Sequence, residues 1–243
     1  MDAVGGAVKA HTASLVTSVH ILPSAVADQL LSIHDNFVYN PLKNGLVKVA
    51  AYIPPAVTPD IVTYTSVGTL VPIMLLILTG NYFLAFLVGL LHDLLDRLDG
   101  AVAFEFHRKG IPRDGEFGAY LDALCDKIFG VLMVTFFVFF TDVSLIWKIA
   151  GMMKNVLSIT SAVIRTQDYI SVKQGTGGNR QIKARGEGKL ATFSENMANA
   201  VCALSLSATV FSPLLMLASL GLLLVSMDMG LRSIQHKLVA RME

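Results

Sequence analysis

The aspartates between positions 93 and 126 have a spacing that could support chemistry. Asp96 and Asp99 are three residues apart, and Asp122 and Asp126 are four apart, so each pair lies on one face of a helix. Apolar runs flank both pairs, and carboxylates within membrane-like sequence are costly and tend to mark function. Four carboxylates in one cleft repel one another unless a divalent cation neutralises them, and hard oxygen ligands favour Mg²⁺, Mn²⁺ or Ca²⁺. The spacing therefore predicts a cation site between two adjacent helices.

Two other interpretations of these acidic residues are open. A single aspartate near a helix end is often only a solvated interface residue, but four at these spacings argue against that. Gly100 and Gly118 stand beside them and leave room for close approach to the backbone. A cation transporter or channel also uses intramembrane acids, but it predicts acids spread through the membrane rather than gathered at one face.

The surrounding composition predicts a membrane protein. Of the 243 residues, 53% are hydrophobic and 15% charged, whereas soluble domains carry about 25% charged residues. The net charge of +1 gives no argument for a nucleic-acid partner. About 20 apolar residues span a bilayer as a helix, and six segments approach that length: 61–79, 81 to the acidic stretch, 117–140, 143–165, 192–211 and 213–229. We predict an all-α polytopic bundle of about six transmembrane helices.

The chain divides into three regions on this basis. Residues 1–35 are expected to form an N-terminal arm, with disorder as one alternative. Residues 36–58 mix apolar residues with lysines and predict a juxtamembrane interfacial helix, with an ordinary linker as the alternative. Residues 59–243 would form the six-helix membrane domain.

Basic residues are distributed unevenly between the predicted loops. Cytoplasmic loops of membrane proteins carry an excess of Lys and Arg. Both termini and the acidic stretch are therefore predicted on the cytoplasmic face, or on the matrix or stromal face of an organelle. The cations that decide this are Lys9, Lys43, Lys48, Arg108, Lys109, Arg113, Lys173, Arg180, Lys183, Arg185, Lys189, Arg232, Lys237 and Arg241.

The acidic motif resembles a known family signature. Asp96-x2-Asp99-Gly100-x2-Ala103, followed by Gly118-x3-Asp122-x3-Asp126, is similar to the D-x2-D-G-x2-A-R…G-x3-D-x3-D pattern of the CDP-alcohol phosphotransferases, integral membrane enzymes of phospholipid synthesis. The stretch TPDIVTYTSVG at 58–68 is similar to the family's PN-x-x-T opening of the first span.

Two departures from the pattern concern catalysis. Phe104 stands where the family has arginine, and the 105–117 loop is longer than usual. Arg97, Arg108, Lys109 or Arg113 could supply the missing charge. These departures favour a non-catalytic homologue as the alternative. A cation-binding membrane protein is a further alternative of another class.

The resemblance implies roles for individual residues. Asp96, Asp99 and Asp122, with Asp126 partly shared, would bind two Mg²⁺ or Mn²⁺ ions, and Asp126 would be the general base. Gly100, Ala103 and Gly118 would leave room for the nucleotide of the donor. Family members are often homodimers. Candidate cations for phosphate or acceptor binding are Arg108, Arg113, Arg165, Lys183, Arg185 and Lys189.

The choice of substrates rests on weaker similarities. Gly188-Lys189-x2-Thr192, followed by Glu195, resembles the G-K-x-K-T-x-x-Q pattern of phosphatidylglycerophosphate and cardiolipin synthases, with Ala191 replacing a lysine. This favours transfer of a phosphatidyl group from CDP-diacylglycerol to a small alcohol such as glycerol 3-phosphate. Asn40-Pro41 instead resembles the opening of the choline and ethanolamine phosphotransferases. A CDP-choline or CDP-ethanolamine enzyme and a phosphatidylinositol or cardiolipin synthase remain alternatives.

Overall fold

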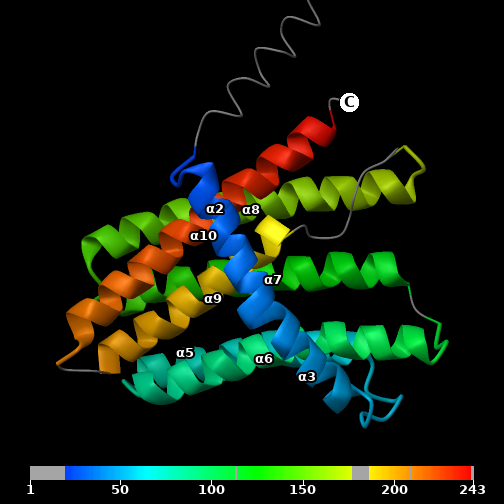
Figure 1. Ribbon diagram of the computed structural model, residues 1–243. Helices are drawn as coiled ribbons and strands as arrows, with labels where there is room; N and C mark the ends of the chain where they lie inside the picture. The colour runs from blue at the N-terminus through cyan, green and yellow to red at the C-terminus, as the bar shows by residue number, and fades with distance from the viewer. Residues whose placement is uncertain (1–19, 113, 177–185, 208–209, 242–243) are drawn as a thin grey trace, which may run out of the picture.

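The computed structural model describes residues 20–112, 114–176, 186–207 and 210–241. All regular elements in these ranges are helices, as the sequence predicts (Figure 1). They are α2 (Ser24–Ile33), the π-helix η1 (His34–Tyr39), α3 (Asn40–Ala50), α4 (Pro59–Gly68), α5 (Leu70–Leu78), α6 (Tyr82–Arg108), α7 (Gly115–Phe140), α8 (Leu145–Lys173), α9 (Gly186–Ser207) and α10 (Ser212–Ala240).

Three helical segments are long and apolar enough to cross a membrane. They are Pro59–Leu78, formed by α4 and α5, then α7 and α10, with mean hydropathies of 2.1, 2.0 and 2.0. Leu75, Phe140 and Leu217 are 57%, 60% and 64% exposed on these helices, and large exposed apolar surfaces mark contact with lipid or protein. Helices α6, α8 and α9 cover the other three predicted segments, and the count of six spans stays a prediction.

Several helices begin at side-chain caps. The Thr58 hydroxyl accepts a hydrogen bond from the Ile61 amide at the start of α4, and the Ser144 hydroxyl accepts one from the Trp147 amide at the start of α8. The Asp114 carboxylate accepts hydrogen bonds from the Glu116 and Phe117 amides at the start of α7. The Phe117 amide and the Lys173 ammonium hold the pKa of Asp114 below its usual value. This cap is therefore lost only when the pH falls through that lowered pKa.

A buried core ties the later helices together. Phe137 and Trp147 pack edge to face with ring centroids 5.7 Å apart, which joins α7 to α8. The Trp147 indole donates to the Ser219 hydroxyl at 2.9 Å, and Ser219 donates to the Ala198 carbonyl at 2.7 Å. These bonds link α8, α10 and α9 and satisfy the buried Trp147 and Ser219 donors.

Helices α2, η1 and α3 form one continuous stretch that crosses the bundle (Figure 1). Asp228 on α10 is fully buried and fixes the chain just before α2. Its Oδ1 atom accepts hydrogen bonds from the Ile21 and Leu22 amides at 2.7 and 3.1 Å. Arg232 donates to Asp228 Oδ2 and to the Leu22 carbonyl, each at 2.7 Å. Part of the region expected to be an arm is thus a helix packed on the bundle through Ala27.

The predicted interfacial segment contains a helix with apolar residues on both sides. Leu46 and Ala50 of α3 are buried against Val102 on α6. Val49 and Tyr52 are 54% and 90% exposed. Exposed apolar residues on a helix of this kind suit a membrane interface, and the interfacial location stays a prediction.

Candidate active site

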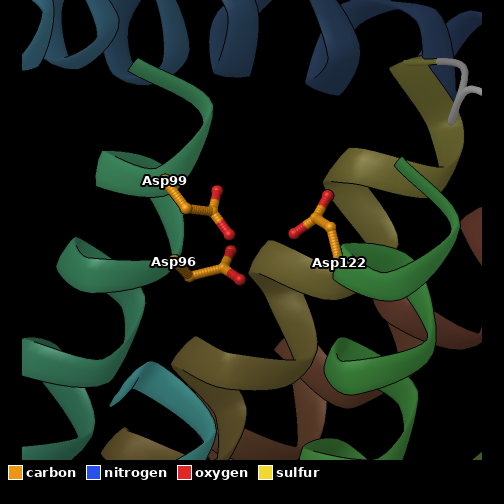
Figure 2. A group of neighbouring side chains, drawn as sticks. All are labelled: Asp96, Asp99 and Asp122. Carbon is orange, nitrogen blue, oxygen red and sulfur yellow. The ribbon is translucent and has the colours of Figure 1, made fainter. Parts of the chain in front are cut away.

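Three carboxylates meet where α6 faces α7. Asp96 and Asp99 stand on α6 and Asp122 on α7, and one oxygen atom of each lies within 4.8 Å of the other two. Figure 2 shows the three side chains pointing toward one another from their two helices. The structure thus brings together three of the four residues predicted as metal ligands.

Asp126 lies one turn after Asp122 on α7 and lines the same cavity. Its Oδ1 atom is buried and has no hydrogen-bond partner among the residues that the structure describes. Leaving a buried polar atom unpaired is costly, so a ligand or ion is expected at this oxygen. Carboxylates alone make up this cluster, and hard oxygen donors of this kind fit Mg²⁺ or Mn²⁺.

Thr63 on α4 supports the cluster from behind. Its hydroxyl donates a hydrogen bond of 2.5 Å to Asp99 Oδ2, and both side chains are buried. Hydrogen bonds of this kind orient a metal ligand and keep it charged. The sequence did not single out Thr63, although it lies in the TPDIVTYTSVG stretch.

Replacing Thr63 with valine should weaken metal activation. The change keeps the shape of the side chain but removes the donor to Asp99, so the metal concentration for half-maximal activity should rise roughly 10- to 100-fold. Thr65→Val is the matched control, because the Thr65 hydroxyl is exposed and, among the described residues, donates only to the Ile61 carbonyl of its own helix. If both variants needed the same metal concentration for half-maximal activity, Thr63 would not orient Asp99.

A cavity of about 1480 Å³ opens over the carboxylates. Gly100 lines it, and a β-carbon at this glycine would meet nothing within 4 Å, so the α6 backbone borders open space there. A cavity of this size can hold a large ligand. The residues predicted from the sequence as catalytic, metal-binding or substrate-binding that line it are Asp96, Asp99, Gly100, Ala103, Gly118, Asp122, Asp126, Arg165 and Lys189.

Helix η1 contributes to the mouth of the cavity. His34 and Tyr39 line it together with Lys189, whose ammonium donates to the Tyr39 hydroxyl at 2.7 Å and lies 4.4 Å from the centre of its ring. Burial lowers the pKa of His34, so this side chain is neutral at pH 7. Of these residues, the sequence had pointed only to Lys189.

Other predicted cations lie elsewhere. Arg108 pairs with Glu105 at 2.7 Å and does not line the cavity. Arg113, Lys183 and Arg185 fall outside the described residues.

Phe104, which replaces the arginine of the motif, lines the cavity and is 49% exposed. Arg97 also lines it, paired with Asp93 at 2.8 Å and 4.8 Å above the Phe193 ring. Among the proposed substitutes for the motif arginine, Arg97 is thus placed at the cavity wall.

Comparison with known families bears directly on this cavity. The family model for CDP-alcohol phosphatidyltransferases matches residues 56–225. The chain belongs to this family. The matched region contains all four aspartates of the motif and excludes α2, η1 and α3. Searches of the curated proteins and of the solved structures found no match.

Membership in the CDP-alcohol phosphatidyltransferase family sets the type of chemistry. Such proteins transfer a phosphatidyl group from a CDP-alcohol to an alcohol. The family generally uses a divalent metal, and Asp96, Asp99 and Asp122 form the group that could hold one.

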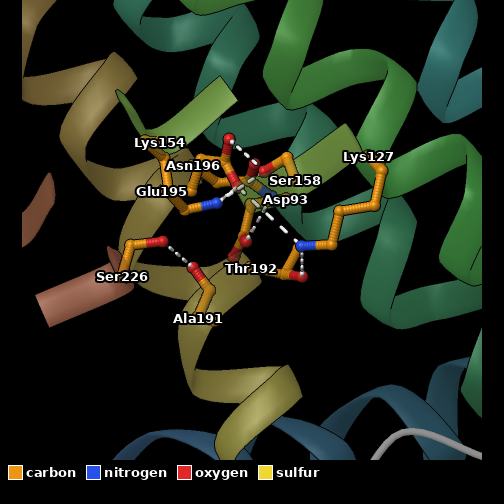
Figure 3. Close-up of polar contacts among 9 residues, drawn as sticks. All are labelled: Asp93, Lys127, Lys154, Ser158, Ala191, Thr192, Glu195, Asn196 and Ser226. Atoms are coloured by element: carbon orange, nitrogen blue, oxygen red, sulfur yellow. Dashed lines mark hydrogen bonds and ion pairs between the residues drawn. The ribbon is translucent and has the colours of Figure 1, made fainter. Parts of the chain in front are cut away.

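A buried polar network borders the phosphatidyltransferase site, and the sequence alone did not assign it (Figure 3). Lys154 on α8 donates to Glu195 on α9 at 2.6 Å and to Ser158 at 2.7 Å, and Lys154 and Glu195 are each 1% exposed. Lys127, next to Asp126, lies 3.9 Å from Glu195. The sequence signal for this network was Lys154 inside an apolar segment, but its partner Glu195 is 41 residues away in the chain.

Gly130 makes room for this network on α7. A β-carbon at Gly130 would lie 2.5 Å from Glu195 Oε1. Gly130→Ala should therefore push Glu195 away from Lys154, with an overpacking cost of about 1–3 kcal/mol. We expect a lower midpoint of thermal unfolding in detergent and reduced activity.

Gly221→Ala on α10 is the control, because its β-carbon would meet nothing within 4 Å. Equal unfolding midpoints for the two variants would contradict the close approach of Glu195.

Proposed function

We propose that this protein transfers the phosphatidyl group of CDP-diacylglycerol to a phosphorylated alcohol, with glycerol 3-phosphate as the first candidate, and releases CMP. The observation that carries the proposal is the Asp96, Asp99 and Asp122 cluster at the floor of a cavity large enough for a nucleotide-linked lipid, in a chain of this family. The lipid tails would remain in the bilayer.

The aspartates would divide the work between binding and proton transfer. Two divalent cations bound by Asp96, Asp99 and Asp122, with Asp126 shared, would neutralise the donor pyrophosphate and the charge that grows on the leaving CMP. Asp126 would take the proton of the acceptor hydroxyl as the new oxygen–phosphorus bond forms and the bond to CMP breaks. The unpartnered Asp126 Oδ1 supports this role.

The remaining cavity residues would position the two substrates. Gly100, Ala103 and Gly118 would leave space for the nucleotide against α6 and α7. Arg165 and Lys189 would face the phosphate of the acceptor, since arginine suits phosphate geometry. The location of the site and both termini on the cytoplasmic, matrix or stromal face, and a homodimer, belong to the same proposal.

The alternative that a specific observation favours is a homologue without turnover, because Phe104 occupies the position of the motif arginine on the cavity wall. A panel of acceptors separates these cases. Purified full-length protein in detergent would receive CDP-diacylglycerol, Mn²⁺ or Mg²⁺, and glycerol 3-phosphate, inositol, serine or phosphatidylglycerol in turn. CMP release with one acceptor names the product, and a second panel would pair CDP-choline and CDP-ethanolamine with diacylglycerol. No CMP release in either panel would favour the non-catalytic homologue.

A further inference from the structure

Arg165 on α8 is a buried cation at the wall of the cavity. It is 6% exposed and lines the cavity. Among the described residues, it makes no hydrogen bond and no ion pair within 4.0 Å. A guanidinium carries five donors, and burying an unpaired charge is strongly unfavourable. Asp126 and Asp122 are the carboxylates that act most strongly on its charge. With those two carboxylates bound to metal ions, Arg165 would be able to receive an anion.

Two lysines add to the positive charge around Arg165. The Lys237 ammonium on α10 is buried without a hydrogen-bond partner among the described residues. The charges of Arg165 and Lys127 act against its own, and that of Asp168 acts in its favour. Asp126, Glu195 and Asp168 offset part of this repulsion, and an anionic ligand would offset more of it.

Asp168 is the carboxylate outside the metal-binding group that could neutralise Arg165 from within the protein. It follows Arg165 by three positions on the same helix, where side chains of opposite charge normally pair. Asp168 is 3% exposed, so a pair formed there would be shielded from water. The structure nevertheless leaves this pair unmade.

Arg241, at the end of α10, pairs with Asp168 instead. Its Nε and Nη2 atoms donate to Asp168 Oδ1 at 2.9 and 2.7 Å. The same guanidinium donates to the Ile164 carbonyl at 2.8 Å and to Gln167 Oε1 at 3.1 Å. Arg241 is thus fixed by the residues on both sides of Arg165 and competes with it for Asp168.

We propose that Arg241 is a positioning residue that holds Asp168 away from Arg165, so that Arg165, together with Lys127, remains available for the phosphate of the acceptor. This inference rests on the proposed function and adds to it a device that sets acceptor affinity. Arg241 itself does not touch the substrate. Without it, Asp168 would turn to Arg165 and cancel the charge that the acceptor needs.

A double-mutant cycle with Arg241→Ala and Asp168→Asn tests this device. In Arg241→Ala, the KM for glycerol 3-phosphate should rise about tenfold while kcat stays within about twofold, because only ground-state binding is lost. Adding Asp168→Asn should return KM to within about threefold of the wild type, since the competing charge is gone. Asp168→Asn alone should change KM by less than about threefold.

The rescue is what a merely structural role would not produce. If Arg241 only tied α10 to α8, the double variant would be as impaired as Arg241→Ala, and that result would overturn the proposal. An unchanged KM in Arg241→Ala would also overturn it.

A binding experiment keeps the inference separate from the proposed function. If the wild type releases no CMP with any acceptor, the proposed function fails, and thermal unfolding with inorganic phosphate in metal-free detergent buffer then tests the anion site. Phosphate should raise the midpoint for the wild type and the double variant but not for Arg241→Ala or Arg165→Ala. No rise in the wild type, or an equal rise in all four proteins, would refute the anion site.

Discussion

Replacing Asp126 with asparagine should lower kcat about 10³-fold, because the acceptor hydroxyl loses the group that takes its proton. The amide keeps the size of the side chain, and the three carboxylates of the cluster, Asp96, Asp99 and Asp122, keep their charges, so the protein should fold and still bind metal. The metal concentration for half-maximal activity should therefore change much less than kcat. Initial rates of CMP release at several Mn²⁺ concentrations would measure both quantities.

Asp142→Asn serves as the control for this substitution. Asp142 is exposed and follows α7, at the end of the helix opposite the carboxylate cluster. It should leave kcat unchanged. If Asp126→Asn kept its rate within about tenfold of the wild type, Asp126 would not be the general base.

Replacing Asp122 with asparagine should produce the opposite pattern. Asp122 is the α7 member of the three-carboxylate group, and removal of its charge takes away a ligand rather than a base. The metal concentration for half-maximal activity should rise by at least about 100-fold, since even outer hydrogen-bond partners of a ligand contribute 10- to 100-fold. At saturating Mn²⁺, part of the rate should return.

The contrast between the two variants separates the two roles. Isothermal titration of Mn²⁺ into each purified variant would check the assignment independently of turnover. Binding by Asp122→Asn as tight as in the wild type would exclude Asp122 as a ligand, whatever its rate.

The sequence predicted the helical class and the carboxylate cluster because both depend on local spacing. Asp96 and Asp99 share one helix face by their separation alone, and so do Asp122 and Asp126. The two pairs lie on consecutive helices, α6 and α7, whose side chains come together at the cluster. The cluster in the structure contains three of these four residues, with Asp126 one turn away.

The contacts that the sequence did not predict join residues far apart in the chain. Thr63 is 36 positions from Asp99, and Arg241 is 73 positions from Asp168. Such pairs depend on how each helix is rotated in the bundle, which hydrophobic periodicity describes poorly when several faces are apolar.

The N-terminal helix escaped prediction for the same physical reason. Its start is fixed by Asp228, which is 207 positions away from Ile21. The sequence between residues 20 and 35 does not indicate a helix start by a capping residue, since Pro23 at the N-cap of α2 makes no side-chain cap.

The most direct test of the central claim follows both products of one reaction. Wild-type protein and Asp126→Asn would be incubated in detergent with CDP-diacylglycerol, glycerol 3-phosphate and Mn²⁺, with and without a chelator. CMP would be quantified by chromatography, and the lipid product by mass spectrometry. The account predicts equal amounts of CMP and a new phosphatidyl lipid, formed only by the wild type and only with metal. CMP release that Asp126→Asn matches, or that persists after chelation, would contradict it.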